Sequence, residues 1–385
     1  MSGRVIVVGS VNIDLVARVP HLPHPGETVT GGIYERHHGG KGGNQAVAAA
    51  RLRRPTLFIG ATGDDTFEID ARRALSSERV DVSMVASLAG QPTGIALILV
   101  DATGENEIAV VPGANGAIEN GYVRDCLARL GPLVGDVLLV CNEVPLHVVR
   151  EALVCGHAAG ATTILNPAPA IGIDRSIFGL ADILTPNRNE LATLLQTDAR
   201  GTGRRVDAAT DTALRARPLL ESGPDGPGVR KAVIVTLGAE GVVVLERAGS
   251  GLNDWRGSGQ SATDRAGTCD DQRAGAPAAP PAQAAPAPAA PATTGRIARA
   301  GRGSAGGEIR VWEVPPDRVA TVDSTGAGDA FCGALAAAIA EGRPLAEAVQ
   351  RAVAAGALAT TRVGAREGMP TAAELEEFIA DRPVG

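Results

Sequence analysis

Short runs of continuously apolar residues alternate along the chain with Ala-rich stretches. The apolar runs predict strands at Val5–Val8, Leu57–Gly60, Val137–Cys141, Thr162–Asn166, Asp182–Leu184 and Ala232–Thr236. Because these runs are apolar on both faces, we expect a mostly parallel sheet covered by helices on both sides. The Ala-rich stretches predict helices at Asn44–Leu52, Asp70–Ser77, Leu146–Ala159, Asn189–Gln196 and Ala330–Glu341. The pattern indicates an α/β layered domain.

Two regions depart from this pattern. Thr28–His38 and Gly94–Val111 are extended and partly alternating, which predicts a small antiparallel sheet within about residues 10–38 and 93–112. Residues 248–307 are rich in Ala, Pro, Gly and Ser, and they include a Pro/Ala tract from Ala276 to Pro291. Such a composition buries too little apolar area to offset the entropy of ordering, which predicts a disordered insert. We therefore expect a single domain over residues 1–385 that contains this insert.

Composition and charge exclude several classes of protein. Hydrophobic residues make up 44% of the chain, which predicts a folded globular protein. The net charge is −7, so a basic nucleic-acid-binding surface is not expected. No apolar run approaches the length of a membrane span. The first strand is too short for the core of a secretory leader. The 5 cysteines form no CxxC pair, which favours reduced thiols and a cytoplasmic location.

The segment Val322-Asp-Ser-Thr-Gly-Ala-Gly-Asp-Ala-Phe331 lies just before an Ala-rich helix. Its glycines allow a tight turn that exposes N–H groups at a helix N-terminus, where anions bind. A carboxylate at Asp329 could accept a hydroxyl proton beside that anion hole, as phosphoryl transfer requires. The alternative is that Asp329 only caps the helix.

A second Gly-rich segment, Gly39-Gly-Lys-Gly-Gly-Asn44, opens the helix that follows it. It is not a Walker A loop, because a glycine follows Lys41 and Glu35 stands at the position of the first glycine. Lys41 and Asn44 could donate to a hydroxylated or anionic ligand. The alternative is a flexible turn with a solvated lysine.

Polar residues also follow the predicted strands. Asn12 and Asp14 follow the first strand and Glu143 follows Val137–Cys141, where open α/β sheets bind ligands. Together they could bind the hydroxyls of a polyol, although each alone is as typical of a turn or an exposed loop.

Two further motifs each have two interpretations. Asn187 and Glu190 open a helix and could place oxygens near hydrated Mg²⁺ and a phosphate, or form a capping box. The turn Thr236–Gly241 could border a nucleotide or simply join two strands of a hairpin.

The order of these motifs closely resembles that of the PfkB-type carbohydrate kinases, and within them the ribokinase group. Further segments of the same kind are His24-Pro-Gly-Glu-Thr-Val29, Gly63-Asp-Asp65, Gly113-Ala-Asn115, Asn166-Pro-Ala-Pro169 and Thr361-Arg-Val-Gly364. The resemblance covers residues 4–245 and 309–380. It implies ATP-dependent phosphorylation of a sugar, with D-ribose and its 5-hydroxyl as the expected substrate and acceptor.

The resemblance implies a role for each matching position. Asp329 is the expected base, and the expected anion hole is Gly326, Ala327 and Gly328. The expected sugar ligands are Asn12, Asp14, Gly40, Lys41, Asn44, Glu143 and Asp329. The expected nucleotide ligands are Asn187, Thr236, Gly238, Glu240, Gly241 and Gly328. Glu190 is expected to organise Mg²⁺, and the expected K⁺ positions are Asp323, Thr325, Ala359, Arg362, Gly364 and Gly368. A homodimer through the small sheet, which doubles as a lid, is also implied.

The chain departs from the family at a few positions. Val353 stands where some ribokinases have a polar residue near adenine, Gly368 replaces a serine of the cation loop, and Cys141-Asn142 precede Glu143. Two other readings stay open: a kinase of the same fold for deoxyribose, fructose or adenosine, and a catalytically silent sugar-binding protein. The Asn12 and Asp14 pair favours ribose, because a deoxy sugar would leave one polar group unpaired.

Overall fold

The computed structural model describes residues 3–196, 208–221, 227–252 and 308–382. In this part of the chain a nine-stranded sheet has the strand order β13-β12-β11-β10-β9-β8-β1-β4-β5. The strands are β1 Val5–Val8, β4 Thr56–Gly63, β5 Val80–Leu88, β8 Val137–Cys141, β9 Thr162–Asn166, β10 Ile183–Leu184, β11 Ala232–Thr236, β12 Val242–Arg247 and β13 Ile309–Val314. Every neighbouring pair from β5 to β11 is parallel, while β12 pairs antiparallel with both β11 and β13. The predicted mostly parallel α/β sheet is confirmed.

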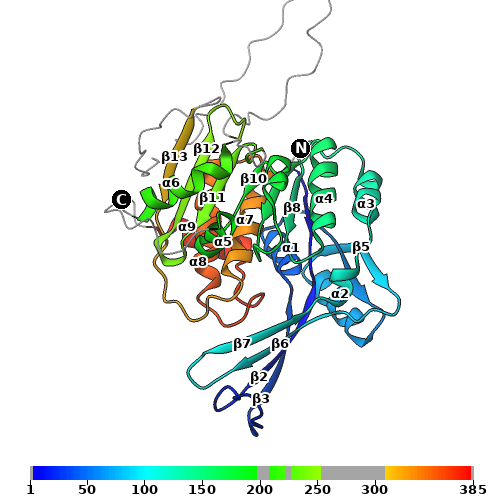
Figure 1. Ribbon diagram of the computed structural model, residues 1–385. Helices are drawn as coiled ribbons and strands as arrows, with labels where there is room; N and C mark the ends of the chain where they lie inside the picture. The colour runs from blue at the N-terminus through cyan, green and yellow to red at the C-terminus, as the bar shows by residue number, and fades with distance from the viewer. Residues whose placement is uncertain (1–2, 197–207, 222–226, 253–307, 383–385) are drawn as a thin grey trace, which may run out of the picture.

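Helices cover both faces of this sheet (Figure 1). Val5 and Val7 of β1 point into one core, and Ile6 and Val8 point into the other. The first core is closed by α1 Lys41–Arg51, α2 Thr66–Ser77, α7 Ala327–Ala340, α8 Leu345–Ala359 and α9 Ala372–Ala380. The second core is closed by α3 Tyr122–Leu130, α4 Leu146–Ala158, α5 Arg188–Leu194 and α6 Ala208–Leu220. The strand sequences are therefore apolar on both faces because helices cover both sides of the sheet, as predicted.

A smaller four-stranded sheet, order β3-β2-β6-β7, projects from the main body (Figure 1). Its strands are β2 Asn12–Arg18, β3 Ile33–Gly39, β6 Gly94–Val100 and β7 Asn106–Val111. The expectation of a purely antiparallel sheet is wrong for one pair, because β2 and β6 run parallel. Each of these two strands leaves the main body in the same direction, so the sheet that they form has to be mixed.

The helix α1 begins earlier than the sequence predicted. Its first residue is Lys41, and Gly40 precedes it with a φ of 83°. Glycines usually disfavour a helix interior, which is why the expected start was later. Here close packing requires one of them, since a Cβ on Gly42 would lie 2.8 Å from the Cα of Gly9. The helix therefore packs directly on the segment that follows β1.

The predicted insert is shorter at its N-terminal end than expected. The Ala248 N–H donates to the carbonyl of Glu308, the Leu345 N–H donates to the carbonyl of Leu252, and Leu252 joins the core. Residues 248–252 therefore belong to the folded domain. The rest of the insert, residues 253–307, lies outside the described residues.

Replacing residues 253–307 with a short Gly/Ser turn should leave activity and melting temperature nearly unchanged. The strands β12 and β13 pair with each other up to Arg247 and Ile309 without help from the replaced segment. Loop-closure entropy also changes only slowly with loop length. Thermal unfolding and a kinase assay check the prediction. As a control, Leu252→Ala in the shortened chain should cost about 2 kcal/mol, because it empties a core position. A shortened chain that loses several degrees with Leu252 intact would contradict the prediction.

Candidate active site

The predicted sugar-binding residues lie together where the small sheet joins the main one. Asn12 and Asp14 are the first and third residues of β2, Lys41 and Asn44 lie in the first turn of α1, and Glu143 follows β8. Asn12 and Asn44 are buried, whereas Asp14, Lys41 and Glu143 are half-buried. They lie beyond the carboxyl ends of β1 and β8, the usual place for ligands in an open α/β sheet.

The carboxylate of Asp329 is held by two side-chain amides of α1. Asn44 Nδ2 donates to Oδ2 at 3.0 Å, and Gln45 Nε2 donates to Oδ1 at 3.0 Å. The residue is 7% exposed, and α7 has no side-chain cap of its own at Gly326. The capping alternative for Asp329 is therefore wrong. Burial raises its pKa, and the positive charge of Lys41 and the two amides oppose that rise only in part. A buried carboxylate with a raised pKa is suited to accept a proton.

Lys41 is not a solvated lysine. Its backbone N–H donates to Glu143 Oε2 at 3.0 Å, and the same oxygen accepts from Ser10 Oγ at 2.5 Å. The pKa of Lys41 rises to about 12, chiefly because its ammonium faces the carboxylate of Asp329. The lysine therefore stays protonated and leaves a fixed positive charge beside the base.

The surroundings of Asp14 disfavour its charged form. Its carboxylate packs on the backbone of Gly39, where a Cβ would lie 2.2 Å from Asp14 Oδ2. Burial raises the pKa of Asp14 to about 6, although the guanidinium of Arg366 lowers it in part. The side chain is thus short of partners that stabilise its charged form, and the hydroxyls of a bound sugar are groups that could supply them.

The amide of Asn12 has a fixed orientation. Its Oδ1 accepts from Asn115 Nδ2 at 2.8 Å, and Asn115 also donates to and accepts from the backbone of Val11. One hydrogen bond to the carbonyl oxygen thereby fixes which way the Asn12 amide is turned. Its NH₂ group is left as the donor that can face a ligand.

The turn before α7 has the backbone that an anion hole needs. Gly326 has a φ of 75°, and a Cβ there would lie 2.8 Å from the Cα of Ala365. A Cβ on Gly328 would meet nothing within 4 Å, so the approach to this turn is open. The expected residues Gly326, Ala327 and Gly328 therefore lie at the N-terminus of α7, where free N–H groups favour a phosphate.

The start of α5 and the turn Thr236–Gly241, which hold most of the expected nucleotide residues, lie side by side. Asn187 forms an isolated β-bridge with Thr236, and Glu240 Oε1 accepts from Arg188 Nη2 at 2.9 Å. Gly238 and Gly241 both have positive φ, and a Cβ on Gly241 would lie 2.3 Å from the carbonyl of Val314. The turn Thr236–Gly241 joins the antiparallel strands β11 and β12, so the prediction of a hairpin is confirmed. The hairpin and a position beside a nucleotide do not exclude each other, because the turn still lies next to Asn187.

Asn187 and Glu190 form the capping box that the sequence left as one alternative. The Glu190 N–H donates to Asn187 Oδ1 at 2.8 Å, and the Asn187 N–H donates to Glu190 Oε2 at 2.8 Å. Burial nevertheless raises the pKa of Glu190. Both oxygens of this half-buried carboxylate accept from Asn187, since Asn187 Nδ2 also donates to Glu190 Oε1 at 2.9 Å.

The expected cation positions lie on two segments, one before α7 and one at and after the end of α8, which a hydrogen bond joins. Asp323 accepts from the N–H and Oγ1 of Thr325 and from the N–H of Gly364, at 2.9, 2.7 and 2.9 Å. A Cβ on Gly368 would lie 2.3 Å from the Ala359 carbonyl oxygen and 3.1 Å from that of Gly364. Gly368 therefore packs closely on both carbonyls, and its N–H donates to the carbonyl of Gly364 at 3.3 Å. The side chain of Arg362 is instead paired with Glu374 at 2.5 Å.

Sequence reasoning missed three residues of this site. Gln45 supports Asp329 from the position after the Gly-rich motif, Asn115 orients Asn12, and the buried Arg366 contacts Asn44. Asn115 lay in a segment that the family resemblance marked without giving it a role. Nothing in the sequence distinguishes Arg366 from an exposed loop arginine.

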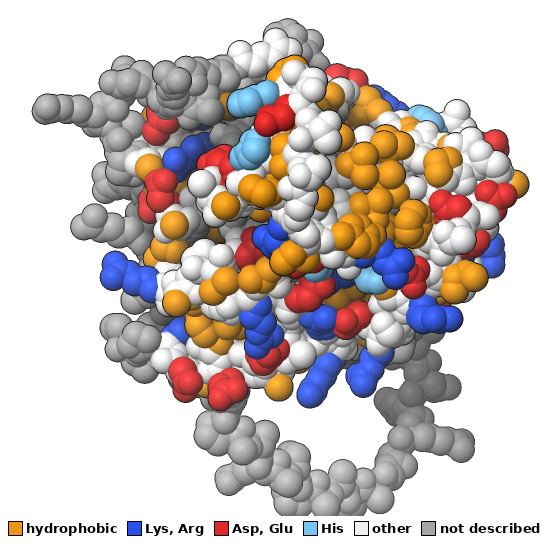
Figure 2. Space-filling view, turned by 90° about the horizontal axis from the view of Figure 1, so that it is seen from below, with side chains coloured by type: hydrophobic (Ala, Val, Ile, Leu, Met, Phe, Trp, Pro, Cys, Tyr) orange, Lys and Arg blue, Asp and Glu red, His pale blue; other side chains and the backbone are white. Residues whose placement is uncertain are grey.

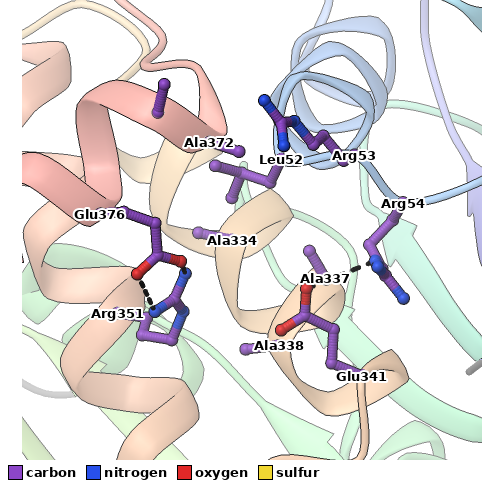
Figure 3. A pocket seen from close by; sticks show the side chains of 11 residues that line it. Leu52, Arg53, Arg54, Ala334, Ala337, Ala338, Glu341, Arg351, Ala372 and Glu376 are labelled. Atoms are coloured by element: carbon purple, nitrogen blue, oxygen red, sulfur yellow. Dashed lines mark hydrogen bonds and ion pairs between the residues drawn. The ribbon is translucent and has the colours of Figure 1, made fainter.

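A separate hollow lies away from these residues. It has a volume of about 380 Å³ and lies between the end of α1 and the helices α7, α8 and α9 (Figure 3). Its floor is largely alanine, and its two glutamates, Glu376 and Glu341, are paired with Arg351 and Arg54. No residue that the motifs singled out lines it, so the candidate site remains at the sheet edge.

A buried carboxylate in the first turn of a helix, with polar side chains nearby, is an arrangement suited to phosphoryl transfer to an alcohol. Comparison with known proteins agrees. The chain matches the pfkB family carbohydrate kinases over residues 2–268 and 303–372, and it belongs to that family. It is 31% identical over 380 residues to the ribokinase of Schizosaccharomyces pombe, covering 97% of this chain and 96% of that protein.

Solved structures show the same relationship. The ribokinase of Thermotoga maritima aligns with a TM-score of 0.69 and 28% identity, over 98% of this chain and 99% of that one. The ribokinase of Cryptococcus neoformans in complex with ADP aligns with a TM-score of 0.68 and 25% identity, over 98% of this chain and 99% of that one. In the described part of this chain, no helix is long and apolar enough to cross a membrane.

Asp14→Asn should stabilise the protein at pH 8 while weakening sugar binding. The pKa of Asp14 rises from an ordinary 3.8 to about 6 on folding. The folded state therefore binds the proton more tightly, and the stability that Asp14 contributes is lost as the pH rises through about 6. The neutral variant avoids this loss, which is at most about 3 kcal/mol. Urea unfolding at pH 8 and about pH 4 checks this, since the gain should shrink at the lower pH.

The control is Asp101→Asn, in the turn between β6 and β7. The pKa of Asp101 is lowered by hydrogen bonds from Thr103 and Glu105 that outweigh its slight desolvation. Its neutral variant should lose stability at pH 8 rather than gain it. Equal effects of the two substitutions would contradict the assignment of Asp14 as a destabilised carboxylate.

Proposed function

We propose that this chain transfers the γ-phosphoryl group of ATP to the 5-hydroxyl of D-ribose, giving ribose 5-phosphate and ADP. The observation that carries the proposal is the Asp329 carboxylate, buried at the start of α7 and held by Asn44 and Gln45. The full-length similarity to ribokinases supports ribose as the substrate. Retention of the base and of the glycine turn argues against a catalytically silent sugar-binding protein.

In this proposal the sugar lies between β2 and α1. Asn12 donates from its oriented amide, Asp14 accepts from ribose hydroxyls, and Lys41, Asn44 and Glu143 contact the rest of the ring with the backbone of Gly40. Asp329 takes the proton of the 5-hydroxyl as its oxygen bonds to the γ-phosphorus and the bond to ADP breaks. The N–H groups of Gly326–Gly328 stabilise the charge on the transferred phosphoryl group.

The nucleotide is expected to lie along the far side of this turn. Asn187, Thr236, Gly238, Glu240 and Gly241 would border it, and Glu190 would hold the water shell of a Mg²⁺ ion. That ion would neutralise charge on the phosphates. The ADP complex of the Cryptococcus neoformans relative supports a nucleotide as the second substrate.

We include two further expectations in the proposal. The small sheet exposes apolar side chains on its strands, and hydrophobic atoms gather on the face from which it projects (Figure 2). The exposed residues are Ile33, Tyr34, Leu97, Ile108, Val110 and Val111. Such a surface favours pairing of two copies through the lid. The free thiols Cys126, Cys141, Cys155 and Cys332 fit a reducing compartment, for which we propose the cytoplasm.

The substrate assignment is tested by measuring ADP release with ATP and a panel of ribose, deoxyribose, fructose and adenosine. Ribose should give the highest kcat/KM. A much higher value for another member of the panel would overturn ribose and keep the kinase. No turnover of any sugar would overturn the kinase itself.

Asp329→Asn should lower kcat by about 10²–10⁴-fold, because it removes the proton acceptor. Ribose binding, measured by calorimetry, should change far less. The matched control is Asp136→Asn, a buried carboxylate that accepts from Arg4 at the other end of β8. That variant should lose stability and keep its kcat. Near-normal turnover by Asp329→Asn would refute the role of Asp329.

K⁺ should raise kcat relative to Na⁺ or choline, because a cation bound near Asp323 and the neighbouring backbone carbonyls would fix the Gly326–Gly328 turn. Gly368→Ala should abolish this response, since its Cβ would displace the carbonyl of Ala359. Melting temperature in K⁺ and in choline gives a second measure that does not depend on turnover. Equal kcat and equal melting temperature in the two salts would contradict a bound cation.

A further inference from the structure

Arg366 is a buried arginine that none of the proposed steps uses. It lies in the loop between α8 and α9 and is 6% exposed. Its Nε donates to Asn44 Oδ1 at 3.0 Å, and its Nη2 donates to the carbonyl of Gly39 at 2.8 Å. The guanidinium thus bridges the last residue of β3 and the first turn of α1.

This arginine is an expensive group to bury. No carboxylate of the described residues lies within ion-pair distance of it, and its Nη1 has no hydrogen-bond partner there. Burial lowers its pKa to about 10, and the more distant Asp14 and Glu367 offset the burial only in part. A buried cation without a close counterion does not stabilise a fold. Its presence therefore needs an explanation other than stability.

The orientation of the Asn44 amide explains why Arg366 is buried here. If this amide turned over, its oxygen would face the carboxylate of Asp329 and its NH₂ group would face the guanidinium of Arg366. Both contacts would be repulsive, because a carboxylate only accepts and a guanidinium only donates. The Arg366 contact therefore fixes the orientation in which Asn44 Nδ2 donates to Asp329 Oδ2. A charged donor also polarises the amide and strengthens that bond.

The neighbours of Arg366 contact the other parts of the site. The Gly364 N–H donates to Asp323, and Ala365 lies against Gly326, where a Cβ would come within 2.8 Å of its Cα. Glu367 pairs with His37 of β3 at 3.5 Å. The segment Gly364–Glu367 therefore contacts Asp323, the Gly326 turn and the small sheet.

We infer that Arg366 is a positioning residue, which orients Asn44 and through it the Asp329 base and the sugar. It does not itself touch the reacting atoms. This inference rests on the proposed sugar kinase function, and it adds a residue that acts on the base through Asn44.

The test is a double-mutant cycle of Arg366→Gln and Asn44→Ala, read by steady-state kinetics. Arg366→Gln alone should lower kcat/KM for ribose by about 10²-fold, because the base and the sugar lose their alignment. KM for ribose should rise while KM for ATP stays constant. In the Asn44→Ala background the same substitution should change kcat/KM by about twofold or less. Arg366→Lys, which keeps the charge and one donor, should recover part of the loss.

The matched control is Arg51→Gln. Arg51 donates to the carbonyls of Arg366 and Met369 and pairs with Glu78, so it holds the same loop without contacting Asn44. This variant should lower the melting temperature and keep KM for ribose. If Arg366→Gln fails to fold, the Arg366→Lys variant carries the cycle. Additive losses in the cycle, or a lower kcat with both KM values unchanged, would overturn the inference. A wild type that phosphorylates no sugar would instead refute the proposed function.

Discussion

The close approach of α1 and α7 is the contact on which the site depends. A Cβ on Gly333 of α7 would lie 2.5 Å from Ala48 Cβ and 2.6 Å from the carbonyl of Gln45. The two helices can pack this tightly only because glycine and alanine line their contact. Both helices begin at the same edge of the sheet, so this packing places Asn44 and Gln45 within hydrogen-bond distance of Asp329. The Ala-rich composition of these helices is thus part of how the base is held.

Burial at this contact sets the charges of the site. Burial raises the pKa of Asp329 and Asp14, whereas Lys41 is held protonated by the carboxylate beside it. If these side chains were exposed to water, their pKa values would be those of ordinary aspartates and lysines. The protein loses stability by burying two carboxylates that prefer to be charged, and it gains groups that bind a proton or a hydroxyl strongly. A trade of stability for function of this kind is common where a site must be organised before its ligand arrives.

The main sheet and the place of Asp329 in the first turn of a helix could be predicted from the sequence because their signals are local. A run such as Val137–Cys141 is apolar on both faces, and its bounds in the structure are the predicted ones. The start of α1 could not be predicted, because the reason for its glycines is contact with Gly9, a residue far away in the sequence. The parallel pairing of β2 with β6 depends on the direction in which both strands leave the body. For Arg366 the sequence carries no signal at all, since its burial comes entirely from tertiary packing.

The strand β2 joins the two halves of the proposed function. At its first residues it is buried and lies against Gly39, in register with Asn12, so the proposed sugar ligands lie where the two sheets meet. Towards its far end it becomes exposed, and all six residues of β7 in the same sheet are exposed. Many of those β7 side chains are apolar, and large exposed apolar patches commonly mark sites of interaction. Any contact that covers the outer part of this sheet would therefore also restrain the strand that carries Asn12 and Asp14. Assembly and sugar binding are for this reason expected to depend on each other.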